Sequence, residues 1–153
     1  MDYDPAMATS GIVGSPARAS AVGIASGAAL VAAVFLPWYE GNLGSPTVPG
    51  ARSGWESTTV AKGVFVLAVV ALIAALLIAA DVADVLPLER RTAESLAWLL
   101  VASSIVAGIL VGYRLARPPG PAEFLSRDIG LFLGVAAAVG GAVAGLAQLA
   151  RRG

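Results

Sequence analysis

Four long apolar runs, separated by short polar links, dominate the pattern of hydrophobic and polar positions along the chain. The runs are residues 19–38, 60–80, 96–113 and 129–150. An α-helix rises about 1.5 Å per residue, so about 20 residues cross the roughly 30 Å hydrocarbon layer of a bilayer. Backbone groups in lipid must be paired within the segment, which favours helices over an open sheet. The pattern predicts an all-α membrane protein, a four-transmembrane-helix bundle with helices near 19–38, 58–82, 95–114 and 129–149.

The segments outside these helices are polar or rich in proline and glycine. Residues 1–18 hold little that could be buried, so we expect a disordered N-terminal tail there and a short C-terminal tail at 151–153. The link 41–52 is typical of an irregular loop. A single membrane domain, residues 19–150, is therefore expected between two tails. Polar side chains suited to N-caps precede or begin the last three helices, at Ser53, Thr92 and Ser126.

Three aromatic side chains lie where the first loop meets the helices on either side of it. Trp38 and Tyr39 follow Pro37 at the end of the first helix, and Trp55 opens the second. Tryptophan and tyrosine are enriched at the membrane–water interface, so we expect Trp38, Tyr39 and Trp55 to form one aromatic belt. Lys62 is the only charge within the four runs. It can extend its ammonium to that interface, and we interpret it as an anchor rather than a functional intramembrane cation.

Glycine residues recur with the spacing of helix turns in three of the four helices, which lets neighbouring backbones approach closely in lipid. The fourth helix carries the longest such stripe, so we predict that it packs through this face against the first and third helices. Pairing of the same face between two copies of the chain is the alternative. The second helix has little such patterning, which is typical of a lipid-facing helix. The glycines concerned are Gly23, Gly27, Gly108, Gly112, Gly130, Gly134, Gly141 and Gly145.

Composition narrows the chemistry. Of the 153 residues, 58% are hydrophobic and 13% are charged, and the mean hydropathy is +0.82, which leaves less polar surface than a soluble domain carries. The net charge is zero, so we expect no nucleic-acid partner. The chain has neither cysteine nor histidine, which excludes disulfides, thiol catalysis and imidazole chemistry and argues against zinc sites. We therefore predict no enzymatic activity, no catalytic residue, no cofactor and no metal site.

Charged residues gather in the two remaining links. The acidic residues between positions 81 and 89 match no metal-binding spacing, so we interpret them as part of a solvated loop. Arg114, Arg117 and Arg127 surround a proline-rich turn and are candidates for binding an anionic lipid headgroup or the carboxylates of a partner. The alternative is ordinary interface anchoring with local pairing to Glu123 and Asp128. Because exposed ion pairs contribute little energy, we favour this alternative over a specific binding site.

Short motifs at the helix ends also carry a family likeness. They are Leu36-Pro37-Trp38-Tyr39, Ser53-Gly54-Trp55, Tyr113-Arg114-Leu115 with Pro118-Pro119-Gly120, and Ser126-Arg127-Asp128-Ile129-Gly130-Leu131. Together with the composition rich in Ala, Gly, Val and Arg, they resemble small four-helix membrane proteins of high-GC Gram-positive (actinobacterial) bacteria, which are mostly described as uncharacterised. The resemblance spans nearly the whole chain. It implies four helices and a plasma-membrane location, and it implies no activity, cofactor or catalytic residue.

Two classes of function stay open. The favoured one is a structural or accessory membrane protein, whose partners are the lipid bilayer and another membrane protein or a second copy of the chain. The alternative is a small oligomeric transporter or channel. Secondary transporters usually need an ionisable or polar group near the membrane midplane. Ser103 and Ser104 are the only clearly polar side chains near a helix centre, and serine commonly bonds the carbonyl of the preceding turn.

The distribution of cations gives no orientation by itself. With both termini inside, the inner segments hold Arg18, Arg90, Arg91, Arg151 and Arg152, and the outer segments hold Arg52, Lys62, Arg114, Arg117 and Arg127. Because the two counts are equal, the positive-inside rule favours neither orientation. We expect both termini in the cytoplasm, because the first loop resembles an external loop of the similar family. A dual topology, in which copies insert both ways, remains the alternative.

Overall fold

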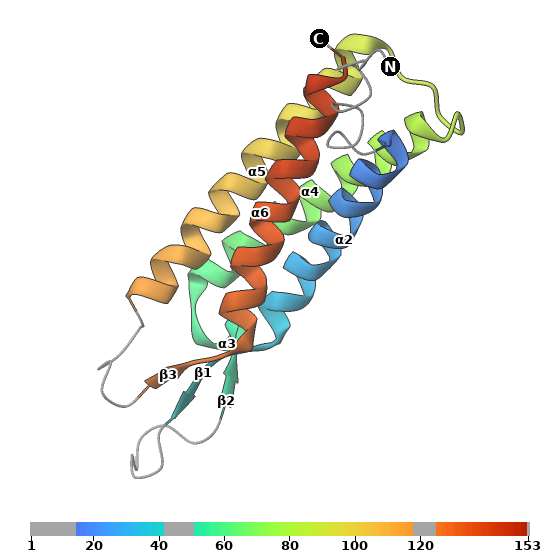
Figure 1. Ribbon diagram of the computed structural model, residues 1–153. Coiled ribbons are helices and arrows are strands. Elements are labelled where there is room, and N and C mark those ends of the chain that lie inside the picture. Colours follow the sequence, from blue (N-terminus) through green and yellow to red (C-terminus); the bar gives the residue numbers. More distant parts are fainter. Residues whose placement is uncertain (1–14, 42–50, 118–124, 153) are drawn as a thin grey trace, which may run out of the picture.

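Four long helices form a bundle in the computed structural model, which describes residues 15–41, 51–117 and 125–152 (Figure 1). They are α2 (Pro16–Phe35), α4 (Thr59–Val82), α5 (Arg90–Ala116) and α6 (Ile129–Ala150). All four are long and apolar enough to cross a membrane. The chain is thus an all-α membrane protein with four candidate spans, as the hydrophobic pattern predicted.

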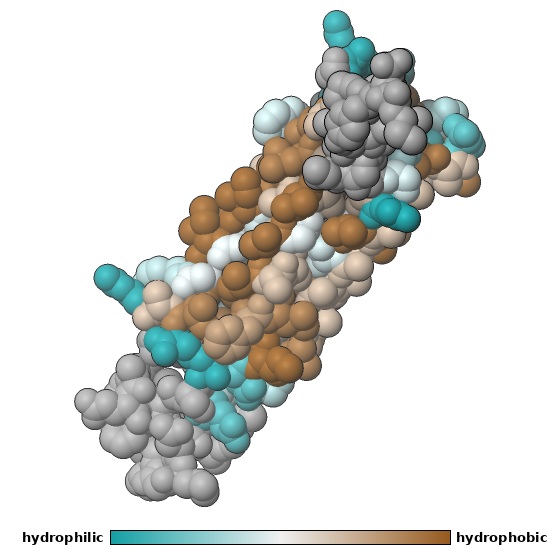
Figure 2. All heavy atoms as spheres, in the orientation of Figure 1, coloured by the Kyte–Doolittle hydropathy of each residue, from teal (hydrophilic) through white to brown (hydrophobic). Residues whose placement is uncertain are grey.

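The four helices stand in a ring in which each packs against two others. α6 packs most extensively against α2 and α5, and α4 packs against the same two helices from the other side. In Figure 1, the start of α2 and the end of α6 lie at one end of the bundle, and the short strands lie at the other. Figure 2 shows apolar residues over the middle of the drawn face and hydrophilic residues toward both ends, which is the distribution that a bilayer requires.

A small antiparallel sheet closes one end of the bundle. Its strands are β1 (Pro37–Gly41), β2 (Ala51–Ser53) and β3 (Leu125–Arg127), in the order β2-β1-β3. Tyr39 of β1 is paired with Arg52 of β2 on one side and with Arg127 of β3 on the other. The expectation of an irregular loop over 41–52 is therefore wrong at both of its ends, and residues 42–50 lie outside the described part.

The first membrane helix begins earlier than expected, whereas the second begins within one residue of the expected position 58 but after another N-cap. Ser15 caps α2, accepting a hydrogen bond from the backbone N–H of Arg18 at 3.4 Å, so the helix starts within the segment assigned to the tail. Ser53 does act as an N-cap, but of the short helix α3 (Gly54–Ser57). Thr58 then breaks the helix with extended backbone angles, and its hydroxyl accepts from Ala61 N–H at 3.2 Å to start α4.

The other two expected caps are wrong. α5 begins after Glu89, several residues before the expected position 95, and Thr92 lies inside its first turn. Ser126 belongs to β3, and Asp128 caps α6 instead by accepting from the Ile129 N–H at 2.6 Å. Ser126 is part of the strand that pairs with β1, so the N-cap is Asp128, the first residue after the strand.

The glycine face of α6 lies against α2 and α5. A Cβ added at Gly141 would lie 2.4 Å from Ser104 Oγ, and one at Gly145 would lie 2.6 Å from Val101 Cγ2. Gly134 is less tight, with Val111 at 3.2 Å from such a Cβ. Distances under 3.0 Å leave no room for a side chain, so hydrogen at these positions permits the close approach that packing in lipid relies on.

The glycines of α2 and α5 differ in how closely neighbouring helices approach them. A Cβ at Gly27 would lie 2.9 Å from Leu72 Cα, and Cβ atoms at Gly23 and Gly108 would meet only alanine or leucine side chains at 3.1 Å or more. Gly112 has nothing within 4 Å of its Cβ position. The expectation that Gly112 is a packing residue is wrong, because this part of α5 faces open space.

The second membrane helix, α4, is the least buried of the four membrane helices, which agrees with its lipid-facing sequence, but one of its faces is packed. Alanines make up most of its buried face, together with Val64 and Ile78, and their small side chains allow a close approach as glycine does in α6. The buried alanines of α4 are Ala61, Ala68, Ala71, Ala74 and Ala75. The sequence did not show which residues form this packed face, because a run of Ala, Val and Leu carries no periodic mark of which alanines are covered.

Candidate functional site

Trp38 is the centre of the sheet-capped end of the bundle. Its side chain is fully buried, and its Nε1–H donates to the Ala33 carbonyl at 2.7 Å. In a regular helix that carbonyl would accept from the residue four positions on, which is Pro37 and has no N–H. The indole therefore supplies the donor that proline removes, and the end of α2 has its carbonyl satisfied inside the protein.

Two glycines make the space for this indole. A Cβ at Gly54 of α3 would lie 2.4 Å from Trp38 Cε2, and a Cβ at Gly130 of α6 would lie 2.7 Å from Trp38 Cδ1. The backbone adds two bonds beside it, from Gly54 N–H to the Leu36 carbonyl and from Asp128 N–H to the Trp38 carbonyl. Strand β1, helix α3 and the start of α6 are thereby fixed to one another.

Tyr39 is buried beside Trp38 and ties the sheet to α5. Its hydroxyl donates to the Arg114 carbonyl at 2.9 Å, and its side chain is 3% exposed. Burial raises the pKa of the Tyr39 hydroxyl above its ordinary value, and the charges of Arg114 and Arg127 oppose that shift without cancelling it. The hydroxyl therefore stays protonated and remains a donor throughout the physiological pH range.

The expected aromatic belt is divided in two. Trp38 and Tyr39 are buried in the protein, so assigning them to an exposed belt was wrong. Both have backbone carbonyl partners for their polar atoms, which removes the cost that made burial look unfavourable. Trp55 is 40% exposed and stacks on Phe35, with ring centroids 5.8 Å apart.

The arginines at this end are also divided. The charges of Arg114 and Arg127 both act on Tyr39, and Arg127 Nε donates to the Leu115 carbonyl. Arg114 Nε is buried without a hydrogen-bond partner, and its guanidinium lies 5.9 Å from the Tyr113 ring centroid. Arg117 lies beyond the end of α5 with its side chain exposed. The structure thus brings Arg114 and Arg127 together and leaves Arg117 at the rim.

Neither of the two ion pairs found in the described part of the chain involves these cations. Asp128 caps α6 through its Oδ1, and the two ion pairs found among residues 15–41, 51–117 and 125–152 lie at the opposite end of the bundle. Glu123, the other expected partner, lies outside the described residues. Arg52 of β2 is paired with Tyr39 of β1, and its side chain is a further exposed cation at this end. We call Arg52, Arg114, Arg117 and Arg127 the arginine surface.

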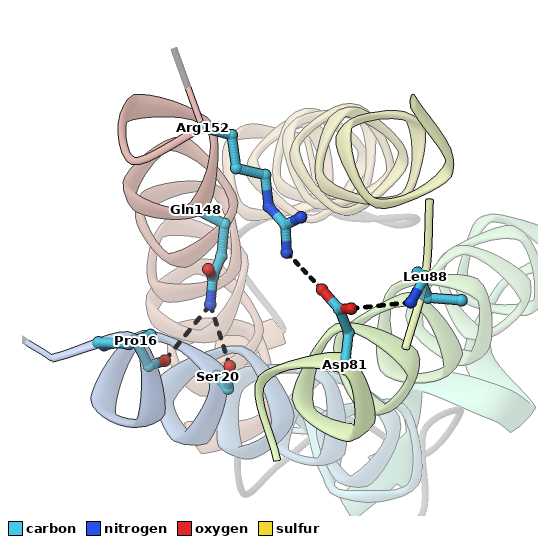
Figure 3. A network of polar contacts seen from close by, with 6 residues as sticks. All are labelled: Pro16, Ser20, Asp81, Leu88, Gln148 and Arg152. Carbon is cyan, nitrogen blue, oxygen red and sulfur yellow. Dashed lines mark hydrogen bonds and ion pairs between the residues drawn. The ribbon is translucent and has the colours of Figure 1, made fainter. Parts of the chain in front are cut away.

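The opposite end of the bundle is closed by polar side chains (Figure 3). Asp81 of α4 forms an ion pair with Arg152 at 2.8 Å and accepts from the Leu88 N–H at 2.9 Å. Gln148 of α6 donates to the Ser20 hydroxyl of α2 at 3.0 Å and to the Pro16 carbonyl at 3.4 Å. Asp81 is thus partly buried and paired, which the interpretation as a solvated loop missed. The described residues hold no group of acidic side chains suited to a metal ion.

The middle of the bundle holds two serines against a pair of glycines. Ser104 Oγ of α5 is fully buried without a hydrogen-bond partner, and it faces Gly141 of α6. Ser26 Oγ of α2 lies 2.5 Å from the Cβ position of the neighbouring Gly140. A glycine Cα–H points where a Cβ would be, so each oxygen meets a weak C–H donor of the kind that recurs between packed helices. Neighbouring Ser103 bonds the Leu99 carbonyl at 2.7 Å instead.

Sequence reasoning missed Gln148, Arg152 and the paired state of Asp81. A signal for Gln148 was present, because it is the only amide in an otherwise apolar helix, and such a side chain is rarely placed against lipid without a partner. Comparison with protein-family models, curated proteins and solved structures found no match.

Proposed function

We propose that this chain is a structural or accessory protein of the plasma membrane, that it binds a partner through its sheet-capped end, and that it is not an enzyme. The observation that supports this proposal is the chemistry of the interior. The buried polar side chains of the described residues are Ser20, Ser26, Thr58, Ser103, Ser104 and Gln148. None of them is ionisable, and the buried Tyr39 hydroxyl lies at the sheet-capped end. Transport coupled to protons or ions usually depends on an ionisable group inside the bundle.

The arginine surface supports a partner of complementary charge. Arg52, Arg117 and Arg127 are exposed at the same end of the bundle. The rigid sheet and the Leu115 carbonyl hold Arg127 in place, so little side-chain entropy is lost when its guanidinium meets a carboxylate. A membrane protein with carboxylates at the same depth fits this surface.

The test is quantitative co-purification of partners with the full-length tagged chain after cross-linking in membranes. We expect Arg117→Glu combined with Arg127→Glu to lose a partner that the native chain retains. Arg18→Glu combined with Arg91→Glu, two exposed cations near the opposite end, is the matched control and should retain it. Equal recovery with both double variants, at unchanged thermal stability, would remove the arginine surface from the proposal.

The alternative, a small oligomeric transporter or channel, draws support from one feature. Ser26 and Ser104 place two hydroxyls near the middle of the bundle, and Ser104 Oγ has no hydrogen-bond partner. Close packing opposes a path there, because Gly140 and Gly141 leave no space beside these oxygens. Flux across proteoliposomes carrying the purified chain, lost in Ser104→Ala, would favour this alternative over the accessory role.

The orientation that we propose places both termini in the cytoplasm and the sheet outside, in a plasma membrane of the actinobacterial type. The resemblance of the first loop to an external loop supports this placement, whereas the counts of cations are tied. Single cysteines at Ser45→Cys and Gly153→Cys test it in whole cells. A membrane-impermeant thiol reagent should label position 45 and spare position 153; labelling of 153 alone would invert the orientation, and partial labelling of both would indicate dual topology.

A further inference from the structure

We propose that Lys62, Trp55, Phe35 and Phe65 form a binding site for one anionic phospholipid of the surrounding bilayer. We call these four residues the lysine–aromatic site. They come from three elements, namely the last turn of α2, the short helix α3 and the first two turns of α4. The site lies at the sheet-capped end of the bundle, where the membrane span of α2 ends and that of α4 begins.

The three rings form a compact cluster that reaches the surface. Phe35 and Trp55 stack at 5.8 Å between centroids, and Phe65 meets both edge-on, at 5.7 Å and 5.5 Å. Phe35 remains 53% exposed and Trp55 40% exposed, so the cluster is covered on one side only. Each ring holds the next in place, which gives the site a fixed shape before any ligand binds.

Lys62 supplies an uncompensated charge to this cluster. Its Nζ lies 5.6 Å from the Trp55 ring centroid, within range of a cation–π contact. No carboxylate forms an ion pair with it among residues 15–41, 51–117 and 125–152, although Glu56 lies nearby in sequence. An ammonium oriented by one aromatic face keeps its other donors free for an oxygen acceptor.

The surroundings point to a lipid as the occupant. The exposed surface that continues along α4 from this site is apolar, with Val66 60% exposed, and a spanning helix presents such a face to acyl chains. Lys62 lies in the first turn of α4, at the depth where headgroup phosphates meet helix ends. A ligand that has acyl chains beside a single negative phosphate matches both parts of the surface.

Charge decides between anionic and zwitterionic lipids. A phosphate diester of either class can accept from Lys62, but a choline headgroup also brings a quaternary ammonium. Lys62 already occupies one approach to the Trp55 ring, so a second cation there would be repelled. The site should therefore prefer phosphatidylglycerol to phosphatidylcholine.

Quenching of Trp55 by brominated lipids tests this preference in vesicles that carry the full-length chain. The contribution of Trp55 is the difference in fluorescence between the native chain and Trp55→Phe, which subtracts Trp38 and Trp98 without altering either. Brominated phosphatidylglycerol is used as a minor component in phosphatidylcholine, and the reciprocal mixture serves as the comparison. We expect phosphatidylglycerol to be enriched at Trp55 by about fivefold, the size of effect that one lysine has near an anionic surface.

Variants separate a built site from general attraction to negative lipid. Lys62→Gln should abolish the enrichment and Lys62→Arg should keep it. Arg117→Gln, which removes an exposed cation from the same end of the bundle, should leave it unchanged, and inorganic phosphate should not compete. Equal quenching by both lipids in the native chain, or an enrichment that survives Lys62→Gln, would overturn the proposal; equal loss in Arg117→Gln would reduce it to a diffuse surface charge.

Discussion

The two ends of the bundle are closed by different chemistry. At the sheet-capped end, Trp38 and Tyr39 are buried and both bond backbone carbonyls, and strand pairing fixes the surrounding segments. At the other end, the closure consists of side-chain contacts, chiefly the Asp81–Arg152 ion pair and the Gln148–Ser20 hydrogen bond. A backbone carbonyl has a fixed position, whereas a long side chain has several rotamers, so the first closure is more strictly defined than the second.

The comparison predicts which end opens first. Truncating a buried tryptophan costs about 3–5 kcal/mol in soluble proteins, and a partly exposed ion pair contributes at most about 1 kcal/mol. Local opening begins where few buried contacts must be broken. We therefore expect the end with the Asp81–Arg152 pair to open before the sheet-capped end. Faster hydrogen exchange at the ends of α4 and α6 near this pair than in the strands would agree with this order.

The largest effect is expected from Trp38→Ala. It leaves a cavity between α3 and α6 and removes the indole donor that the Ala33 carbonyl has in place of the missing Pro37 N–H, so we expect a loss of about 3–5 kcal/mol. Thermal unfolding in mild detergent measures the change. Trp98→Ala is the matched control, because that indole is 59% exposed and should shift the midpoint little. Similar shifts for both would contradict the central position of Trp38.

A smaller loss is expected from Gly130→Ala. The added methyl would lie 2.6 Å from the Pro37 carbonyl oxygen and 2.7 Å from Trp38 Cδ1, and backbone cannot move aside as a flexible side chain can. Overpacking of this kind costs about 1–3 kcal/mol. Gly112→Ala, with nothing within 4 Å of its methyl, should be neutral. Equal thermal unfolding midpoints for the two variants would contradict overpacking at position 130.

Tyr39→Phe should cost about 1 kcal/mol, the usual contribution of one hydrogen bond. The effect should depend on pH. The folded chain holds the pKa of Tyr39 above its ordinary value of 10.0, so the unfolded chain releases this proton first as the pH rises. The stabilisation is complete below about pH 10 and is lost as the pH rises through the folded pKa. Unfolding midpoints of both chains between neutral and strongly alkaline pH should therefore converge; a constant difference would contradict the burial argument.

The smallest effect is expected at the opposite end. A double-mutant cycle of Asp81→Asn and Arg152→Gln isolates their interaction, which we place below about 1 kcal/mol at low salt because both side chains keep some contact with solvent. Added salt should reduce it. A coupling as large as the loss caused by Trp38→Ala would reverse the ranking of the two ends.

The sequence predicted the four helices well because the need to pair every backbone group in lipid leaves few alternatives to a helix. The sheet was not predictable from its strands, since they are three to five residues long and carry no alternation over that length. Its central pairing joins Tyr39 with Arg127, which are far apart along the chain. Contacts of that kind are set by how the helices pack, and the local pattern does not encode them.

The candidate site was predictable in part. Arg114 and Arg127 flank one short link, so their proximity followed from chain length, while the direction of each side chain did not. Trp38 illustrates the limit most clearly. An indole near the end of an apolar helix is equally typical of a membrane interface and of a buried cap. Trp38 is buried because Gly54 of α3 and Gly130 of α6 leave space for its indole.

The sheet also orders events during synthesis. Strands β1 and β2 emerge early, but one edge of β1 has to wait for β3, which precedes the last membrane helix. Until residues 125–127 reach the same side of the membrane as residues 37–41, the central strand has one unpaired edge and the Trp38 carbonyl lacks the Asp128 donor. A chain whose third helix failed to cross could not complete this pairing. The complete sheet therefore forms only in a chain whose two intervening helices have crossed the membrane. A chain inserted wrongly keeps an unpaired edge on its central strand.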